Sequence, residues 1–180
     1  MNHNIINSIQ GFQGKKTLKE LSKDTSGPST EYMTQSTLLA TDFDSVKRDY
    51  ANSFSHSEND VCSFDALIQS SDEILFIEFK NGEVKNANIR WKAYDSLLIF
   101  LDMCNYPVDL LRTHDSLIVV YNKTKNESSQ VMSNKSIKRL AGEELIMFNL
   151  ERFSGLFFKS VHTYNEEEFE SYLSQTSFLQ

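Results

Sequence analysis

The sequence predicts an α/β domain of the α+β kind, with a central mixed sheet flanked by helices. Three observations predict it: two apolar runs around a short polar connection, a long segment with helical periodicity, and a β-branched run after that segment. The length of 180 residues, 39% of them hydrophobic, suits one domain with an ordinary core. We expect residues 1–30 to form a polar N-terminal segment with a short helix, and residues 31–180 to form the single domain.

Residues 62–68 and 74–80 are rich in Ile, Leu and Phe, and the polar residues between them are typical of a β-hairpin connection. Alternation along the second strand places Glu78 and Lys80 on one face with Ile74 and Phe76. A strand that is apolar on both faces is buried, and buried charges need a partner or a metal ion. The alternative interpretation is a surface ion pair of little energetic value.

Helical periodicity precedes and follows this hairpin. Thr41 or Asp42 can cap a first helix, whose predicted buried face comprises Phe43, Val46, Tyr50 and Phe54. Residues 88–103 predict the longest helix, with a buried stripe of Ile89, Ala93, Leu97 and Leu101, widened by Tyr94, Leu98 and Phe100. Tyr106-Pro107 ends that helix, and residues 115–121 predict a buried strand.

The two ends of the chain are more polar. Residues 17–23 predict a short helix with Leu18 and Leu21 inward, followed by a loop at 25–30. We expect residues 122–135 to be a loop, residues 137–141 a short basic helix, and residues 145–150 and 156–161 edge strands. A last acidic helix, capped by Thr163 or Asn165, should extend through Leu173.

Asp65 is followed thirteen residues later by Glu78-Phe79-Lys80, on an apolar hairpin with a helix after it. This arrangement, which covers roughly residues 42–121, resembles the PD-(D/E)XK nuclease superfamily. The resemblance implies a restriction-endonuclease-like core and metal-dependent hydrolysis of phosphodiester bonds, with DNA expected in preference to RNA. Asp65 and Glu78 would hold Mg²⁺, for which Mn²⁺ should substitute, and Lys80 would orient water or stabilise the anionic transition state. Arg90 and Lys92 would contact substrate phosphate.

Two features of the resemblance are left open. Members of the superfamily have a strand before the one that carries the Asp, and the polar interval 55–60 leaves little room for it. That strand is therefore either missing or supplied from elsewhere in the chain. An additional metal-site acid often comes from a preceding helix, and the available acids, which a solvated helix face explains as well, are Glu31, Asp42, Asp44 and Asp49.

The charge distribution allows a second class of function. The formal net charge is −7, which is unusual for a nucleic-acid-binding surface. Residues 80–139 nevertheless carry ten basic and six acidic residues, a net charge of +4, whereas the rest of the chain carries −11. The alternative is a non-catalytic binding module on the same fold, such as an immunity or defence-associated protein that binds a basic toxin. The acidic run at Glu166, Glu167, Glu168 and Glu170 is consistent with it.

Cys62 and Cys104 are far apart, with no CxxC motif, which predicts neither a disulfide framework nor a zinc site and favours a reducing cytoplasm. No apolar run approaches the about 20 residues needed to cross a bilayer, and the N-terminus lacks a signal-peptide pattern. We therefore expect a cytoplasmic protein without a membrane partner. Whether it forms a homodimer to cut two strands is left open by the sequence.

Overall fold

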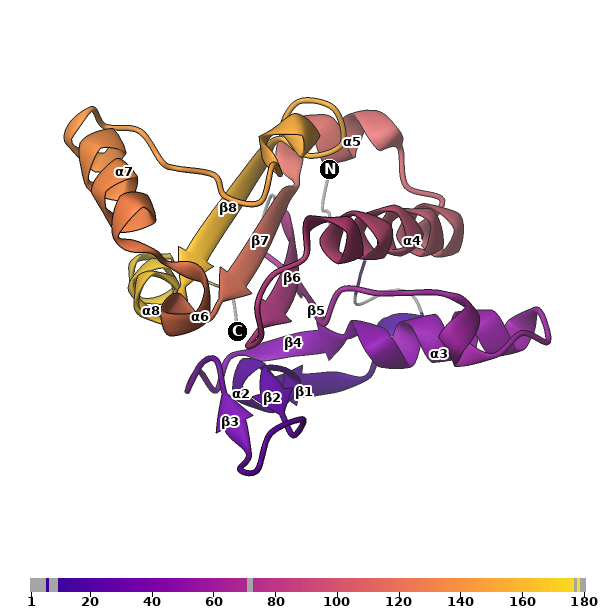
Figure 1. Cartoon of the computed structure of the whole chain (residues 1–180). Coiled ribbons are helices and arrows are strands. Elements are labelled where there is room, and N and C mark those ends of the chain that lie inside the picture. Colours follow the sequence, from indigo (N-terminus) through magenta and orange to yellow (C-terminus); the bar gives the residue numbers. More distant parts are fainter. Residues whose placement is uncertain (1–5, 7–9, 71–72, 177, 179–180) are drawn as a thin grey trace.

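A computed structural model describes residues 6, 10–70, 73–176 and 178 (Figure 1). The predicted class is confirmed: a six-stranded mixed sheet is flanked by helices. Its strands, in spatial order, are β1 (Lys15–Thr17), β4 (Leu39–Asp42), β5 (Ala66–Gln69), β6 (Ile74–Lys80), β7 (Ser116–Tyr121) and β8 (Ser160–Asn165). A separate two-stranded ribbon pairs β2 (Lys23–Asp24) with β3 (Glu31–Tyr32).

The strand pairing changes direction in the middle of the sheet. Strands β1, β4, β5 and β6 pair antiparallel, and β6, β7 and β8 pair parallel. The predicted hairpin of β5 and β6 is present, with Leu67 opposite Phe76. Residues 55–60 contain no strand, and β5 pairs instead with β4, which lies upstream of the first long helix.

Helices cover both faces of the sheet because its alternate side chains point in opposite directions. One face packs against α3 (Phe43–Ser53), α4 (Asn86–Cys104) and α5 (Val108–His114). The other packs against α2 (Leu18–Leu21) and α8 (Glu166–Gln175). Helices α6 (Lys123–Asn126) and α7 (Ser129–Leu140) follow β7, and α7 projects beside β8 (Figure 1). Short 3₁₀ turns occupy Gln10–Phe12, Glu58–Asp60 and Glu151–Phe153.

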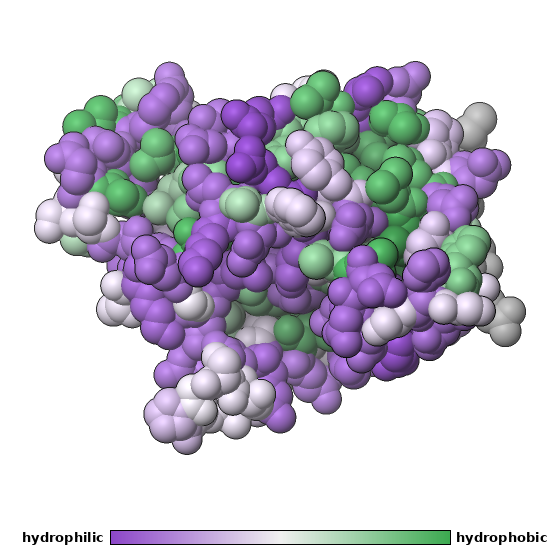
Figure 2. Space-filling view, turned by 45° about the vertical axis from the view of Figure 1, so that its right-hand side comes forward, coloured by the Kyte–Doolittle hydropathy of each residue, from purple (hydrophilic) through white to green (hydrophobic). Residues whose placement is uncertain are grey.

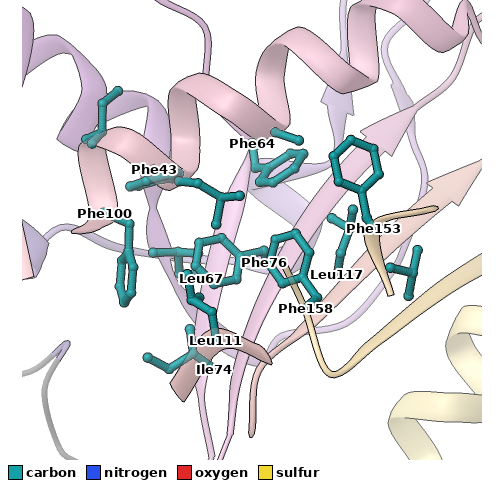
Figure 3. Packing of buried hydrophobic residues seen from close by; sticks show 14 of the residues in the cluster. Phe43, Phe64, Leu67, Ile74, Phe76, Phe100, Leu111, Leu117, Phe153 and Phe158 are labelled. Carbon is teal, nitrogen blue, oxygen red and sulfur yellow. The ribbon is translucent and has the colours of Figure 1, made fainter. Parts of the chain in front are cut away.

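The larger core lies between α4 and the sheet and is rich in aromatic rings (Figure 3). Phe76 is at its centre: its ring lies 5.1 Å from that of Phe100 and 5.3 Å from that of Phe158 between centroids, in edge-to-face geometry. Phe64 adds a third ring at 6.2 Å. This packing fixes β6 against α4, and thereby fixes the side chains that both elements direct toward the C-terminal end of β6.

The predicted helix caps are partly confirmed. Asp42 caps α3 by accepting a hydrogen bond from the Ser45 amide, and Phe43 and Val46 are buried. The prediction for Phe54 was wrong: the helix ends at Ser53, so Phe54 leaves its buried face and is 59% exposed. In α4, Ile89, Ala93 and Leu97 are buried with Phe100, and Leu101 is half-buried. Tyr94 and Leu98 instead lie on the outer face of α4, 46% and 66% exposed.

Figure 2 shows a mainly hydrophilic surface on which hydrophobic side chains gather at the upper right, where Figure 1 places α4 and α5. Exposed side chains of α4 contribute apolar surface, and Trp91 is 69% exposed. Within the described part of the chain, no helix combines the length and apolar character needed to cross a bilayer.

The C-terminal third differs most from the prediction. Residues 122–135 are not a loop, because Asn122 and Ser128 cap two helices there, α6 and α7. Residues 145–150 form no strand but run along the edge of β8, where Thr163 Oγ1 hydrogen-bonds to the backbone of Leu145 and Met147. The predicted strand at 156–161 begins only at Ser160, after the turn that contains Gly155. Asn165, one of the two predicted capping residues, caps α8 through a capping box with Glu168.

The N-terminal segment contributes to the same sheet. Thr17 caps α2 within the predicted range, and Leu18 is buried. Strand β1 pairs with β4, and Ile6 and Phe12 belong to the larger core. Of the residues before 30 that the structure describes, Ile6, Phe12 and Leu18 are therefore packed in its cores.

Candidate active site

The hairpin brings Asp65 beside Glu78. Ala66 is paired with Ile77, so continuing the same antiparallel register places Asp65 opposite Glu78. Two hydrogen bonds fix Asp65: its amide donates to Ile77 O at 3.1 Å, and its Oδ2 accepts from the Phe79 amide at 2.6 Å. The carboxylates of two neighbouring strands therefore converge at the C-terminal end of β6.

Two ammonium groups complete the cluster. Glu78 is fully buried, and Lys80 Nζ lies 2.5 Å from its Oε1, as expected for residues that share one face of the strand. Lys92 Nζ, from the second turn of α4, lies 2.8 Å from Glu78 Oε1 and 3.0 Å from Oε2. The same atom is 3.3 Å from Asp65 Oδ1. Lys92 thus bridges both carboxylates.

Lys92 was predicted to contact substrate phosphate, and the structure places its ammonium in the carboxylate cluster. Sequence periodicity contains a signal for this position: Lys92 follows buried Ile89 by three residues and precedes buried Ser96 by four, so it lies beside the inward stripe of α4. Arg90, the other predicted phosphate contact, is half-buried, and none of the ion pairs of the cluster involves it.

Burial sets the protonation of this cluster. Removal from water and, to a smaller extent, the negative charge of Glu78 raise the pKa of Asp65, whereas the charge of Lys92 and the hydrogen bond from Phe79 lower it; the net result is a pKa of about 7. Burial alone would lower the pKa of Lys92, but the charges of Asp65 and Glu78 outweigh this effect and raise it. Lys92 is therefore a permanent cation, and Asp65 changes charge near neutral pH.

A cavity of about 310 Å³ opens at the cluster and is lined by Asp65, Lys80 and Lys92 together with Lys23, Asn81 and Gly82. Its volume lies at the lower end of the range typical of small-ligand sites. Lys80 and Lys92 are each about a quarter exposed, which allows their ammonium groups to meet a molecule in the cavity. The cavity therefore gives solvent access to an otherwise buried pair of carboxylates.

The β2–β3 ribbon forms a fixed acidic wall near this cavity. Asn81 Nδ2 donates to Asp24 Oδ2 at 2.8 Å and to Glu31 Oε2 at 2.6 Å, and Asn122 Nδ2 donates to Asn81 Oδ1 at 2.8 Å. Hydrogen bonds from Ser26 and Asn81 lower the pKa of Asp24 to about 2. Asp24 thus keeps its negative charge at neutral pH, so the cavity has an acidic side opposed to its lysines.

The four acids considered as a further ligand serve other contacts. Asp42 caps α3 and pairs with Lys16 at 2.6 Å, and Asp49 lies 3.5 Å from Arg48. Asp44 accepts a hydrogen bond from Ser63 at 2.6 Å, and its charge helps to raise the pKa of Lys92. Glu31, in the β2–β3 ribbon, accepts the hydrogen bond from Asn81. Across the described ranges, no three Asp, Glu, His or Cys side chains gather in a metal-binding group.

Comparison with protein-family models, with curated proteins and with solved structures found no match for this chain. The fold and the site thus define an α+β domain with two carboxylates and two lysines at the open end of a central hairpin.

Proposed function

We propose that this chain is a Mg²⁺-dependent nuclease of the PD-(D/E)XK kind, with a restriction-endonuclease-like core, that hydrolyses phosphodiester bonds of DNA in preference to RNA. The observation that carries the proposal is the bridge made by Lys92 Nζ, which contacts oxygens of both Asp65 and Glu78 at 2.8 to 3.3 Å. One cationic group fits between the two carboxylates, so their spacing suits a shared cation. The proposed core is also supported by the antiparallel pairing of β4, β5 and β6 and by the parallel pairing of β6 with β7.

The donor set suits magnesium. Mg²⁺ prefers hard oxygen ligands and is commonly held by one or two carboxylates together with substrate phosphate. Asp65 and Glu78 would hold it, and Lys92 would have to withdraw from the space between them. Its long, flexible side chain allows this movement into the adjoining cavity, where the freed ammonium can pair with a phosphate oxygen.

When bound, the metal would supply Lewis acidity toward the phosphate and lower the pKa of water. The residues of the chain supply the rest. Lys80 is held by Glu78 at 2.5 Å and lines the cavity, so its ammonium can orient water or stabilise negative charge that develops on the phosphate. The hydrogen bond from the Phe79 amide fixes the orientation of Asp65, and above about pH 7 Asp65 is mainly ionised and able to act as a ligand.

The test is incubation of purified protein with supercoiled DNA, linear DNA and structured RNA in Mg²⁺, in Mn²⁺ and in EDTA. We expect cleavage with either metal, faster on DNA, and none in EDTA. Glu78→Gln should remove the activity, whereas Glu58→Gln, a change of the same kind at an exposed position, should leave it unchanged. Equal cleavage by the Glu78→Gln protein would assign the activity to a contaminant.

A second function is favoured by one observation: the two carboxylates of the cluster are already balanced by two ammonium groups. A charge-balanced buried cluster needs no metal, which is what a non-catalytic binding module with a basic protein partner, such as a toxin, would have. For either function we propose a cytoplasmic location, since Cys62 and Cys104 are free thiols. Asp65→Asn combined with Glu78→Gln separates the two functions, because only the nuclease needs both charges.

A further inference from the structure

A second cluster lies at the opposite end of the sheet, where the parallel strands begin. Ser116 and Ser160 are the first residues of β7 and β8 and are paired in register, and Glu73 directly precedes β6. Ser116 Oγ donates to Glu73 Oε1, and it lies 2.7 Å from Ser160 Oγ. His162 and Glu144 continue the contacts, so these five residues form one hydrogen-bonded chain across β7 and β8, which we call the serine–histidine chain.

The outer part of the serine–histidine chain has the geometry of a serine nucleophile with its base. Ser160 Oγ is 2.9 Å from His162 Nε2, and His162 Nδ1 is 2.7 Å from Glu144 Oε2. Both distances fall in the range of about 2.6 to 3.2 Å that such sites require. No local pattern in the sequence indicates this group. Glu144 is sixteen residues before Ser160, and it directly precedes residues 145–150, which were predicted to form a strand.

The base is held in one orientation. Glu144 Oε1 accepts a hydrogen bond from the Thr163 amide at 3.1 Å, which fixes the carboxylate at the edge of β8. The imidazole of His162 stacks on the ring of Tyr164, with centroids 5.6 Å apart and planes 16° from parallel. With Nδ1 directed at a carboxylate, the neutral imidazole carries its proton on Nδ1 and presents Nε2 as an acceptor to Ser160.

The group is accessible from solvent. Strand β8 is an edge strand of the sheet, and the side chains of His162 and Glu144 are 28% and 34% exposed. Ser160 is half-buried between them and Ser116. A small reagent can therefore reach the hydroxyl without unfolding the sheet.

We propose that Ser160 is an activated nucleophile, with His162 as its general base and Glu144 orienting the base, and that it accepts the acyl group of activated carboxylic esters. In this step the Ser160 oxygen forms a bond to the carbonyl carbon while the ester C–O bond breaks. The hydroxyl proton moves to His162 Nε2, and from there to the departing alkoxide. Water then releases the acyl group as a carboxylate and restores the serine. This site is independent of the proposed nuclease site.

The inner part of the serine–histidine chain controls whether Ser160 can donate to His162. An ionised Glu73 only accepts, so Ser116 donates to it, and Ser160 must then donate to Ser116 if their 2.7 Å contact is a hydrogen bond. In that order Ser160 has no second proton for the neutral imidazole, so it donates to His162 Nε2 only when it gives up its hydrogen bond to Ser116. A donor at position 73 would favour catalysis, because Ser116 could then donate to Ser160 and Ser160 to His162. Other titratable groups around the serine–histidine chain are Tyr164, Tyr172 on α8, and Asp115, which directly precedes Ser116. The negative charge of Glu73 contributes to the raised pKa of both Tyr172 and Asp115.

The test uses the full chain with two probes, a fluorophosphonate and p-nitrophenyl acetate. We expect one fluorophosphonate adduct with loss of fluoride, mapped to Ser160 by peptide mass spectrometry, and slow release of p-nitrophenolate at pH 8. Both should disappear in Ser160→Ala and fall at least tenfold in His162→Gln. Labelling and p-nitrophenolate release should fall less in Glu144→Gln than in His162→Gln, because Glu144 only positions the base.

Two further variants sharpen the result. The amide of Glu73→Gln can donate a hydrogen bond to Ser116 where the carboxylate of Glu73 cannot, so this variant should be labelled faster than the natural chain. His56→Gln is the matched control, since His56 pairs with Asp60 at 3.4 Å and lies far along the chain from Ser160. The proposal is overturned if no adduct forms on Ser160 in protein with native circular dichroism. It is also overturned if labelling persists at the natural rate in His162→Gln, or if Glu73→Gln is labelled more slowly than the natural chain.

Discussion

Lys92 on helix α4 and Glu78 on strand β6 form the closest link between the helical layer and the candidate active site, with Lys92 Nζ 2.8 Å from Glu78 Oε1. Glu78 is fully buried, so its charge has to be compensated within the protein. Lys80 compensates it from the same strand, and Lys92 compensates it from across the core. The pair therefore joins the packing of α4 to the chemistry at the end of the hairpin.

Glu78→Gln tests this role together with the proposed activity. The substitution keeps the size of the side chain and removes the charge, so we expect cleavage to fall by orders of magnitude. Two half-buried ammonium groups would lose their shared partner, which should lower the free energy of unfolding by about 3 kcal/mol. Urea unfolding followed by circular dichroism measures the loss, with Glu58→Gln as the exposed control. An unchanged midpoint would mean that the charge of Glu78 is compensated differently.

Lys92→Met separates an ion-pair cluster from a metal site. Without the bridging ammonium, Asp65 and Glu78 repel each other and only Lys80 opposes them, so the melting temperature should fall at pH 8. A cation bound between the carboxylates would restore the melting temperature. A ligand present at about 100 times its Kd stabilises the folded state by about 2.7 kcal/mol. We therefore expect 10 mM Mg²⁺ to raise the melting temperature of Lys92→Met more than that of the natural chain.

Calcium and sodium at equal ionic strength are the controls for this measurement, and Lys47→Met, which removes an ion pair with Asp44 on α3, is the matched variant. An Mg²⁺ effect of the same size in all three proteins would indicate general screening rather than a site.

The side-chain placements that the sequence predicted and the structure shows are those whose signal is local. Alternation along β6 placed Glu78 and Lys80 on one face, and the hairpin pattern brought Asp65 to Glu78. Lys92 joins them from a helix 14 residues beyond Glu78, and its contact depends on how α4 packs on the sheet. Patterns in a single segment do not contain that packing, so the sequence predicted the carboxylates and Lys80 but not the bridge.

The errors in the C-terminal third have related physical causes. Helix α7 has no buried residue and is attached largely through charged contacts such as Lys135 with Glu127 and Glu168, so no apolar stripe marks it in the sequence. Residues 145–150 are apolar enough to suggest a strand. Instead of pairing with β8 through backbone hydrogen bonds, however, Leu145 and Met147 hydrogen-bond to Thr163 Oγ1. In both segments side-chain contacts distant in sequence override the local pattern.

Asp115 provides a pH-dependent prediction outside the candidate active site. It is 1% exposed, its Oδ1 accepts from the Ile74 amide at 2.8 Å, and burial raises its pKa from 3.8 to about 6. The folded protein thus binds this proton more tightly than the unfolded chain. The contribution of Asp115 to stability is most favourable below about pH 4 and is lost as the pH rises through about 6.

Asp115→Asn keeps an acceptor for Ile74 and removes the charge. Compared with the natural chain, it should be similar at pH 4 and more stable by about 2 to 3 kcal/mol at pH 7.5, since one pKa unit corresponds to about 1.4 kcal/mol. Thermal unfolding across this pH range measures the difference in stability. Asp109→Asn is the control: the Asp109 side chain is 90% exposed, so this variant should show no such pH-dependent gain over the natural chain. A difference that does not change with pH would contradict the assignment.

The final prediction separates a nuclease from a binding module by what each needs from the same two carboxylates. A nuclease needs Asp65 and Glu78 as charges, because a cation has to be held where the phosphate binds. A binding module needs its outer surface and depends on this interior pair only for stability. The test therefore compares the double variant, Asp65→Asn combined with Glu78→Gln, with a variant whose charges are reversed at the acidic start of α8, Glu166 to Glu168. Glu167 is exposed there, and Glu166 and Glu168 are half-buried.

If the chain is a nuclease, the double variant abolishes its effect in cells and its cleavage of DNA, while reversal on α8 leaves both nearly unchanged. If it is a binding module, the double variant keeps the cellular effect, and reversal on α8 weakens capture of a basic partner, by a factor that shrinks as salt is raised. Lys135 and the Lys123 amide contact this acidic turn, so circular dichroism has to show that the reversed protein is folded. We expect the first pattern, and a full cellular effect from the folded double variant would exclude the nuclease.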